Sequence, residues 1–132
     1  MVTRDGAIRT INVEMGYSER GNGEPLMLVH ARVFADWFLP VASSPTLDEF
    51  RVIRVVRAGC GSNGASLSFS IQDCAKHLAD LTESLQLDKL HVPGHSSGAL
   101  IALQFAADYP SMVDPPSRRF PMAIYQPHST AL

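Results

Sequence analysis

The stretch KLHVPGHSSGALIALQFAADYP, residues 89–110, decides the fold of this chain. Its first part, KLHVPGH, predicts a short strand, with Pro93 tolerated only near the strand's end. The second part, from Ser96 onward, is apolar on nearly every side, which is typical of a helix buried between layers, and Pro110 ends it. The stretch therefore predicts a strand that turns directly into a buried helix.

The segments before this stretch continue the same alternation of apolar strands and helices. The predicted strands are 7–15, 26–30 and 50–56, and the predicted helices are a short one in 36–44 and a long one over 70–87. Ser70 is placed to cap the long helix, while Pro40 keeps the other one short. This order predicts an α/β fold with a mostly parallel sheet and helices on both of its faces.

Composition is that of one globular domain. The chain has 132 residues, 45% of them hydrophobic, and a formal net charge of −2. No basic stripe indicates nucleic acid, and no apolar run is long enough to span a membrane, so we expect a soluble, cytoplasmic protein. Cys60 and Cys74 lie outside any metal-ligand pattern, and we expect two free thiols, with no disulfide and no metal.

The chain changes character near its C-terminal end. Residues 1–113 carry the periodic segments, whereas 114–132, DPPSRRFPMAIYQPHSTAL, contain four of the nine prolines and no extended periodic run. We predict one domain over 1–113 and an irregular, Pro-rich tail over 114–132. The abrupt change at Asp114 suggests a truncated or frame-shifted product, in which the tail would be foreign to the fold.

The join between predicted strand and helix matches the pattern G-x-S-x-G at residues 94–98. This pattern places a serine on a strained strand-to-helix turn, from which its hydroxyl projects as a nucleophile. Ser96 is that serine, and the backbone N–H of Ser97 would point from a helix N-terminus toward a developing oxyanion. The alternative is an ordinary glycine turn, but the strand and the helix that the motif requires were both predicted from periodicity alone.

A second glycine pattern, GCGSNG at 59–64, matches the G-x-G-x-x-G of dinucleotide sites. Two features argue against that interpretation. In such sites the glycines open the helix directly, but here ASLSF intervenes before Ser70. The next strand also ends in Gly94-His95, not in the acidic residue that would bind a ribose.

Taken together, the motifs resemble the N-terminal half of an α/β-hydrolase of the lipase, esterase and haloperoxidase type. The stretches that carry the resemblance are 21–41, 50–63 and 87–113. It implies that Ser96 is the nucleophile and that the backbone N–H groups of Ser97 and Arg32 form the oxyanion hole, with no cofactor. His30-Ala31 stands where the family usually has His-Gly. A serine nucleophile argues against the haloalkane dehalogenase and epoxide hydrolase branches.

The other notable side chains have plainer interpretations. We expect His95 to shape the turn beside Ser96, His77 to be solvated on the polar side of its helix, and His91 to be a core histidine with its polar atoms satisfied. Trp37 is expected to pack over the entrance of the site.

The residues needed to activate Ser96 are the weakest part of the pattern. In this fold an acid and then a histidine follow the serine, and here only Asp108, Asp114 and His128 are available. None is placed on a suitable strand end. The sequence therefore leaves two hypotheses: a serine hydrolase acting on a small ester or related acyl substrate, or a catalytically silent fragment that self-associates through an exposed edge at strand 89–95.

Overall fold

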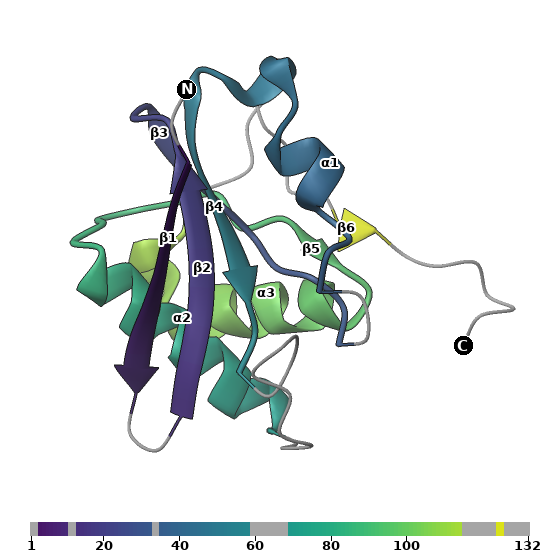
Figure 1. The fold of residues 1–132 in the computed structure, drawn as a ribbon. Helices are drawn as coiled ribbons and strands as arrows, with labels where there is room; N and C mark the ends of the chain where they lie inside the picture. Colours follow the sequence, from purple (N-terminus) through teal and green to yellow (C-terminus); the bar gives the residue numbers. More distant parts are fainter. Residues whose placement is uncertain (1–2, 11–12, 33–34, 59–68, 115–123, 126–132) are drawn as a thin grey trace, which may run out of the picture.

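A computed structural model describes residues 3–10, 13–32, 35–58, 69–114 and 124–125 of the chain (Figure 1). The strands are β1 (Thr3–Thr10), β2 (Val13–Arg20), β3 (Glu24–Leu28), β4 (Phe50–Val56), β5 (Gly94–His95) and β6 (Ile124–Tyr125). The α-helices are α1 (Leu39–Ala42), α2 (Ile71–Ser84) and α3 (Ser97–Asp108), and two 3-10 turns are η1 (Pro45–Leu47) and η3 (Pro110–Met112). The predicted strand over 50–56 and the predicted cap of α2 are confirmed, with Ser70 Oγ accepting from the Asp73 N–H at 3.0 Å.

The strands form an open mixed sheet, in which most strands run parallel to one another, as predicted. One ladder has the order β1-β2-β4-β3, and β5 pairs with β6. Parallel bridges from Leu26 to His91 and from Val29 to Gly94 join the segment 90–95 to β3. Among the described strands only β2 runs against the others, because β1 and β4 are both antiparallel to it and the remaining pairings are parallel.

Backbone hydrogen bonds hold the segment 90–95 against β3 over most of its length. His91 donates to Pro25 O at 3.1 Å and accepts from Met27 N–H at 2.8 Å, and His95 donates to Val29 O at 3.0 Å. Pro93 also faces β3 and accepts from the Val29 N–H at 3.1 Å, but its nitrogen carries no hydrogen to donate. The proline thus interrupts this ladder at one bond, which is why the regular strand β5 is short.

The prediction of one strand over 7–15 is wrong. The chain forms an antiparallel hairpin there, in which Thr10 pairs with Val13 and Ala7 with Gly16. Apolar and polar residues alternate on both sides of the reversal, so periodicity alone does not reveal it. Asn12 is a residue type favoured in two-residue hairpin loops and was the available signal; residues 11–12 themselves lie outside the described part.

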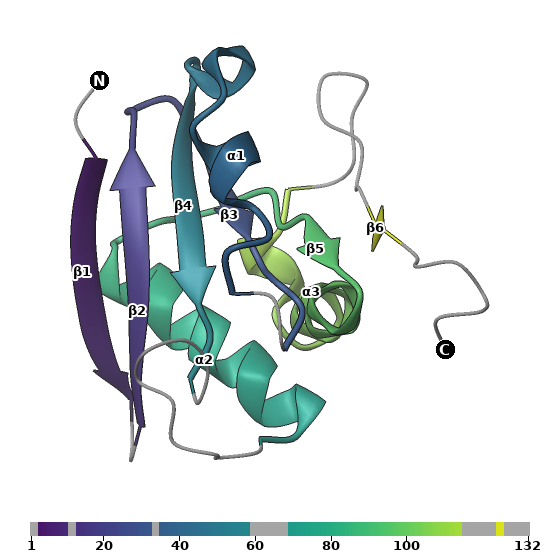
Figure 2. The ribbon, with the colours of Figure 1, turned by 45° about the vertical axis from the view of Figure 1, so that its right-hand side comes forward.

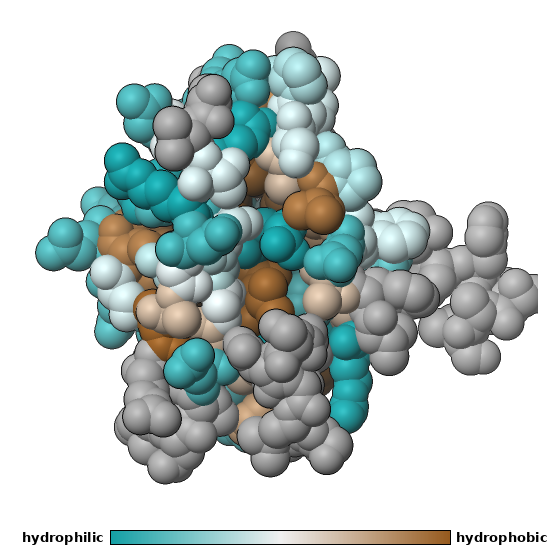
Figure 3. Space-filling view, in the orientation of Figure 1, coloured by the Kyte–Doolittle hydropathy of each residue, from teal (hydrophilic) through white to brown (hydrophobic). Residues whose placement is uncertain are grey.

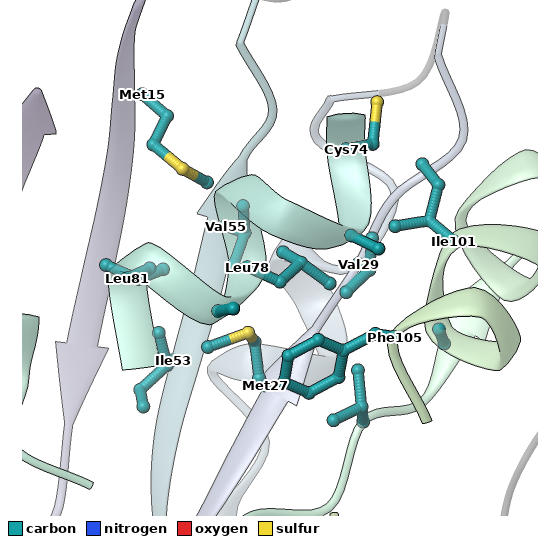
Figure 4. Close-up of a cluster of buried hydrophobic side chains, with 14 of the residues drawn as sticks. Met15, Met27, Val29, Ile53, Val55, Cys74, Leu78, Leu81, Ile101 and Phe105 are labelled. Carbon is teal, nitrogen blue, oxygen red and sulfur yellow. The ribbon is translucent and has the colours of Figure 1, made fainter. Parts of the chain in front are cut away.

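Helices cover both faces of the sheet, as predicted. One face packs against α2 and α3 through a large buried cluster, part of which is drawn in Figure 4. Phe105 of α3 and Leu78 of α2 lie at its centre, 0% and 1% exposed. On the other face Leu26, Leu28, Phe50 and Val52 pack under Phe38, Ala42 and Leu47 of the α1 and η1 region. Figure 2 shows α2 and α3 packed together and α1 apart from them.

The C-terminal segment contributes to the sheet. Ile124–Tyr125 form β6, parallel to β5, and Val113 makes a parallel bridge with Leu90. The segment predicted to be irregular therefore includes one short strand, and the strand predicted to be an open edge has partners at both of its ends. Residues 115–123 and 126–132 lie outside the described part, and the domain boundary at 113 stays a prediction.

Two glycines let α3 begin almost in contact with the sheet. A Cβ added to Gly98 would lie 2.2 Å from Val29 O, and one added to Gly94 would lie 2.4 Å from Gly98 O. Both distances are far below van der Waals contact with backbone atoms that cannot rotate away. The absence of side chains at these two positions therefore sets the distance between β3, β5 and the first turn of α3.

The described helices include none long and apolar enough to cross a membrane. On the face shown in Figure 3, hydrophobic areas are small and lie between hydrophilic residues.

We predict that Gly98→Ala destabilises the fold by about 1–3 kcal/mol, since the new methyl group must push α3 away from β3. The measurement is the free energy of unfolding from denaturant titration. Gly16→Ala is the matched control, because a Cβ there meets Val56 Cβ at an ordinary 3.7 Å, and it should leave stability the same or slightly raised. Equal stability of Gly98→Ala and the unsubstituted chain would contradict the close approach.

Candidate active site

Ser96 lies between the end of β5 and the start of α3. Its φ of 55° and ψ of −118° place it in a region that residues with a side chain rarely adopt. The strained turn predicted for this serine is therefore present. Its hydroxyl has no hydrogen-bond partner among the described residues, and the side chain is half-buried, so the oxygen is open to a reacting molecule.

Ser97 is the first residue of α3, and its hydroxyl oxygen accepts two hydrogen bonds. The backbone N–H of Arg32 donates to Ser97 Oγ at 3.1 Å, and Arg57 Nη1 donates to the same oxygen at 3.2 Å. The structure thus brings Arg32 to the first turn of α3, where the resemblance to hydrolases places it. The Arg32 N–H does not point into open space, however, since it ends on a neighbouring hydroxyl.

Arg57 follows β4 directly, and no role was predicted for it from the sequence. Its Nη1 donates to His30 O at 3.1 Å as well as to Ser97 Oγ, and its Nη2 lies 3.9 Å from Cys74 Sγ. It therefore links the ends of β3 and β4 with the first turns of α2 and α3. The available signal was its position at the carboxyl end of a parallel strand, the edge at which α/β proteins place their sites.

His30 fixes the loop that carries Arg32. The ring is 1% exposed. Its Nδ1 is 2.6 Å from Ala31 O, which can only accept, and its Nε2 is 3.0 Å from the Arg57 N–H, which can only donate. These partners define a neutral ring with the proton on Nδ1. Burial is the main cause that lowers the pKa of His30 from 6.5 to about 4, and the nearby charges of Arg57 and Arg54 act in the same direction.

His95 and Trp37 form the wall beside Ser96. Their rings stack with centroids 4.0 Å apart and planes within 4°. His95 is buried, which lowers its pKa, whereas Trp37 remains 46% exposed. The arrangement agrees with the expected shaping role of His95, and it places an aromatic surface next to the turn. Leu39 and Val41 of α1 are also each 46% exposed.

The predictions for the two remaining described histidines had different outcomes. His77 is buried at 9% exposure and packs edge-on against Phe69 at 4.9 Å, so its predicted solvation is wrong. The buried face of α2 is wider than the apolar residues alone indicate. His91 is a buried histidine with polar partners, as predicted, because its Nε2 lies 3.3 Å from Glu24 Oε2.

Neither acid available after Ser96 lies near it. Asp108 is the last residue of α3, about 17 Å along the helix axis from Ser96, and it accepts from Gln104 at 2.9 Å. Asp114 donates its N–H to Leu90 O at the opposite end of segment 90–95. His128, Cys60 and the glycine pattern 59–64 lie outside the described residues. Within the described part, no three His, Cys, Asp or Glu side chains gather as a metal site.

The family model described as "alpha/beta hydrolase fold" matches residues 24–114, which run from β3 to just past η3 and include the strained serine and its neighbours. This chain belongs to the α/β-hydrolase family. The resemblance inferred from the motifs is thereby confirmed.

Relatives within the family carry several hydrolase names. A putative carbamate hydrolase of Yersinia enterocolitica is 34% identical over 67 residues, covering 49% of this chain and 24% of that protein. A 2-hydroxy-6-oxo-2,4-heptadienoate hydrolase of Pseudomonas putida is 26% identical over 109 residues, covering 76% of this chain and 38% of that protein. Epoxide hydrolase 1 of Caenorhabditis elegans is 29% identical over 114 residues, covering 81% of this chain and 28% of that protein.

Solved structures agree on the fold. The epoxide hydrolase CorEH superposes with a TM-score of 0.75 at 28% identity, covering 86% of this chain and 41% of that one. The N-acyl homoserine lactonase AidH superposes equally well, with a TM-score of 0.75 at 22% identity over 89% of this chain and 48% of that one. This chain thus spans less than half the length of the relatives it matches.

We predict that the His30 ring stays neutral down to a pH near 4. An unfolded chain takes up this proton near pH 6.5, whereas the folded chain takes it up at about 4. The stability contributed by a neutral His30 is therefore complete above pH 6.5 and is lost as the pH falls to about 4. NMR titration of the ring protons measures this directly, and a midpoint near 6.5 would contradict the buried, neutral ring.

Proposed function

We propose that this chain carries the nucleophile of a serine hydrolase that acts on an ester or related acyl substrate. The observation that carries the proposal is the left-handed φ of Ser96 at a strand-to-helix junction. A backbone conformation of this kind is costly and persists only where the surroundings enforce it. Here Gly94 and Gly98 allow the approach that enforces it.

The proposed reaction proceeds through an acyl-enzyme. Ser96 Oγ bonds to the carbonyl carbon of the substrate while the carbonyl π pair moves onto its oxygen and a base takes the Oγ proton. The oxyanion is stabilised by the N–H of Ser97 at the first turn of α3. Collapse of the intermediate expels the protonated leaving group, and water then hydrolyses the ester on Ser96. The base is not among the described residues that contact Ser96.

We propose an acyl substrate because residue 96 is a serine. A serine oxygen forms an ester with an acyl group, which water cleaves at the carbonyl carbon, and this chemistry suits carbonyl substrates. The half-exposed ring of Trp37 beside His95 offers an apolar surface for an acyl chain. The relatives named for carbamate and oxo-dienoate hydrolysis are consistent with a carbonyl substrate, whereas those named for epoxides are not.

A catalytically silent chain that associates with itself is the second candidate. It is favoured by the positions of Asp108 and Asp114, both remote from Ser96. Its contact surface would be the edge of the sheet near β5 and β6. This candidate predicts a concentration-dependent mass in solution without turnover of any ester.

We predict that Ser96→Ala abolishes covalent labelling by an alkyl fluorophosphonate and lowers hydrolysis of p-nitrophenyl acetate by at least about 10³-fold. Intact-mass spectrometry counts the labels, and absorbance follows the ester. Ser111→Ala, which removes an exposed serine of η3, is the matched control and should react like the unsubstituted chain. Equal labelling of Ser96→Ala would refute the assignment, and an unlabelled parent chain would favour the silent alternative.

A further inference from the structure

We propose that the hydroxyl of Ser97, and not only its backbone amide, donates a hydrogen bond to the oxyanion, with Arg57 holding that hydroxyl in place. This inference rests on the proposed acyl transfer at Ser96. It changes the oxyanion hole that the family resemblance implies, in which two backbone amides converge on the substrate oxygen.

The hydrogen bonds at Ser97 Oγ determine which role remains for this hydroxyl. A hydroxyl has two acceptor lone pairs and one hydrogen to donate. Both acceptor positions are filled, by the Arg32 N–H at 3.1 Å and by Arg57 Nη1 at 3.2 Å. The hydrogen has no acceptor among the described residues. The only hydrogen bond left for this hydroxyl is therefore one in which it donates.

The backbone amide of Arg32 has a different partner from the one that the resemblance implies. The resemblance aims this N–H at the substrate oxygen, but the structure shows it bound to Ser97 Oγ. The hydroxyl therefore lies next to the donor that would have met the oxyanion. The amide nitrogen of Ser97 lies at the start of α3, and the proposal has one acceptor receive both the N–H and the O–H of this residue.

The charge of Arg57 strengthens the Ser97 hydroxyl as a donor. A guanidinium group that donates to a hydroxyl oxygen draws electron density from it and strengthens the O–H as a donor. Arg57 also donates to His30 O and, through its backbone N–H, to His30 Nε2. Because the pKa of His30 is lowered to about 4 by burial, that acceptor stays neutral at neutral pH, and Arg57 keeps its position.

No proton leaves Ser97 in this scheme. When Ser96 Oγ bonds to the carbonyl carbon, the π pair of the carbonyl moves to its oxygen, which accepts hydrogen bonds from the Ser97 N–H and O–H. When the intermediate collapses, the pair returns to the carbonyl bond, and the Ser97 hydroxyl keeps the bonds that it accepts from Arg32 and Arg57. Ser97 is thus a catalytic residue, and Arg57 is a positioning residue that acts through it.

The test is the second-order rate of labelling by an alkyl fluorophosphonate, whose phosphoryl oxygen takes the place of the oxyanion. We expect Ser97→Ala, and the near-isosteric Ser97→Cys, to react about 10- to 100-fold more slowly than the parent chain. Ser97→Thr keeps a hydroxyl, so its labelling rate should stay within several-fold of the parent rate. Melting temperatures identify any variant that does not fold.

Arg57→Gln separates a positioning role from a purely structural one. If Arg57 acts through the Ser97 hydroxyl, its replacement slows labelling of the parent chain but adds nothing to Ser97→Ala. If Arg57→Gln slows labelling of Ser97→Ala by the same factor as it slows labelling of the parent chain, the two residues act independently and this part of the proposal is overturned.

The outcomes separate the two proposals. Labelling of Ser97→Ala and Ser97→Cys at the parent rate, or faster because an obstructing hydroxyl has gone, overturns the inference while leaving the nucleophile in place. A parent chain that is not labelled at Ser96 refutes the proposed function, and the role of Ser97 falls with it.

Discussion

The close approach of α3 to the sheet is the constraint on which the rest of this structure depends. Backbone atoms of Val29 and His30, directly after β3, and of the first turn of α3 occupy the space where side chains at Gly98 and Gly94 would lie. The chain can pass from β5 into α3 at this distance only by a sharp turn, and Ser96 takes the left-handed conformation at that turn. Strain at one residue is thus imposed by packing between two layers, and the same packing supplies the free energy that sustains it.

A partly buried network of polar groups is the second constraint on the structure. His30, Arg57 and the hydroxyl of Ser97 connect three chain segments that are far apart in sequence. An arginine with much of its surface removed from water is costly unless carbonyl oxygens and other acceptors surround it. Here the Arg57 guanidinium donates to the backbone carbonyl of His30 and to the Ser97 hydroxyl. The backbone N–H of Arg57 donates to the neutral imidazole of His30. This network fixes the loop after β3 against α3, so its benefit is placement of polar atoms beside Ser96.

Much of the fold could be predicted from the sequence because its segments have strong periodicity. Strand 50–56, the cap at Ser70 and the turn at Ser96 follow from local patterns that the tertiary structure reinforces. The hairpin within 3–20 was missed, since alternation continues on both sides of the reversal. His77 was missed because its burial depends on Phe69, a residue outside the helix. The hydrogen-bond partners of Arg57 could not be predicted, because they come from the ends of other elements, although its position at the end of a parallel strand was a signal.

The most direct test of the central claim is a crystal structure of the chain after reaction with an alkyl fluorophosphonate. The account predicts electron density continuous from Ser96 Oγ to phosphorus, with the phosphoryl oxygen within hydrogen-bond distance of Ser97. An adduct on any other side chain, or a Ser96 with an ordinary helical or extended backbone, would contradict it.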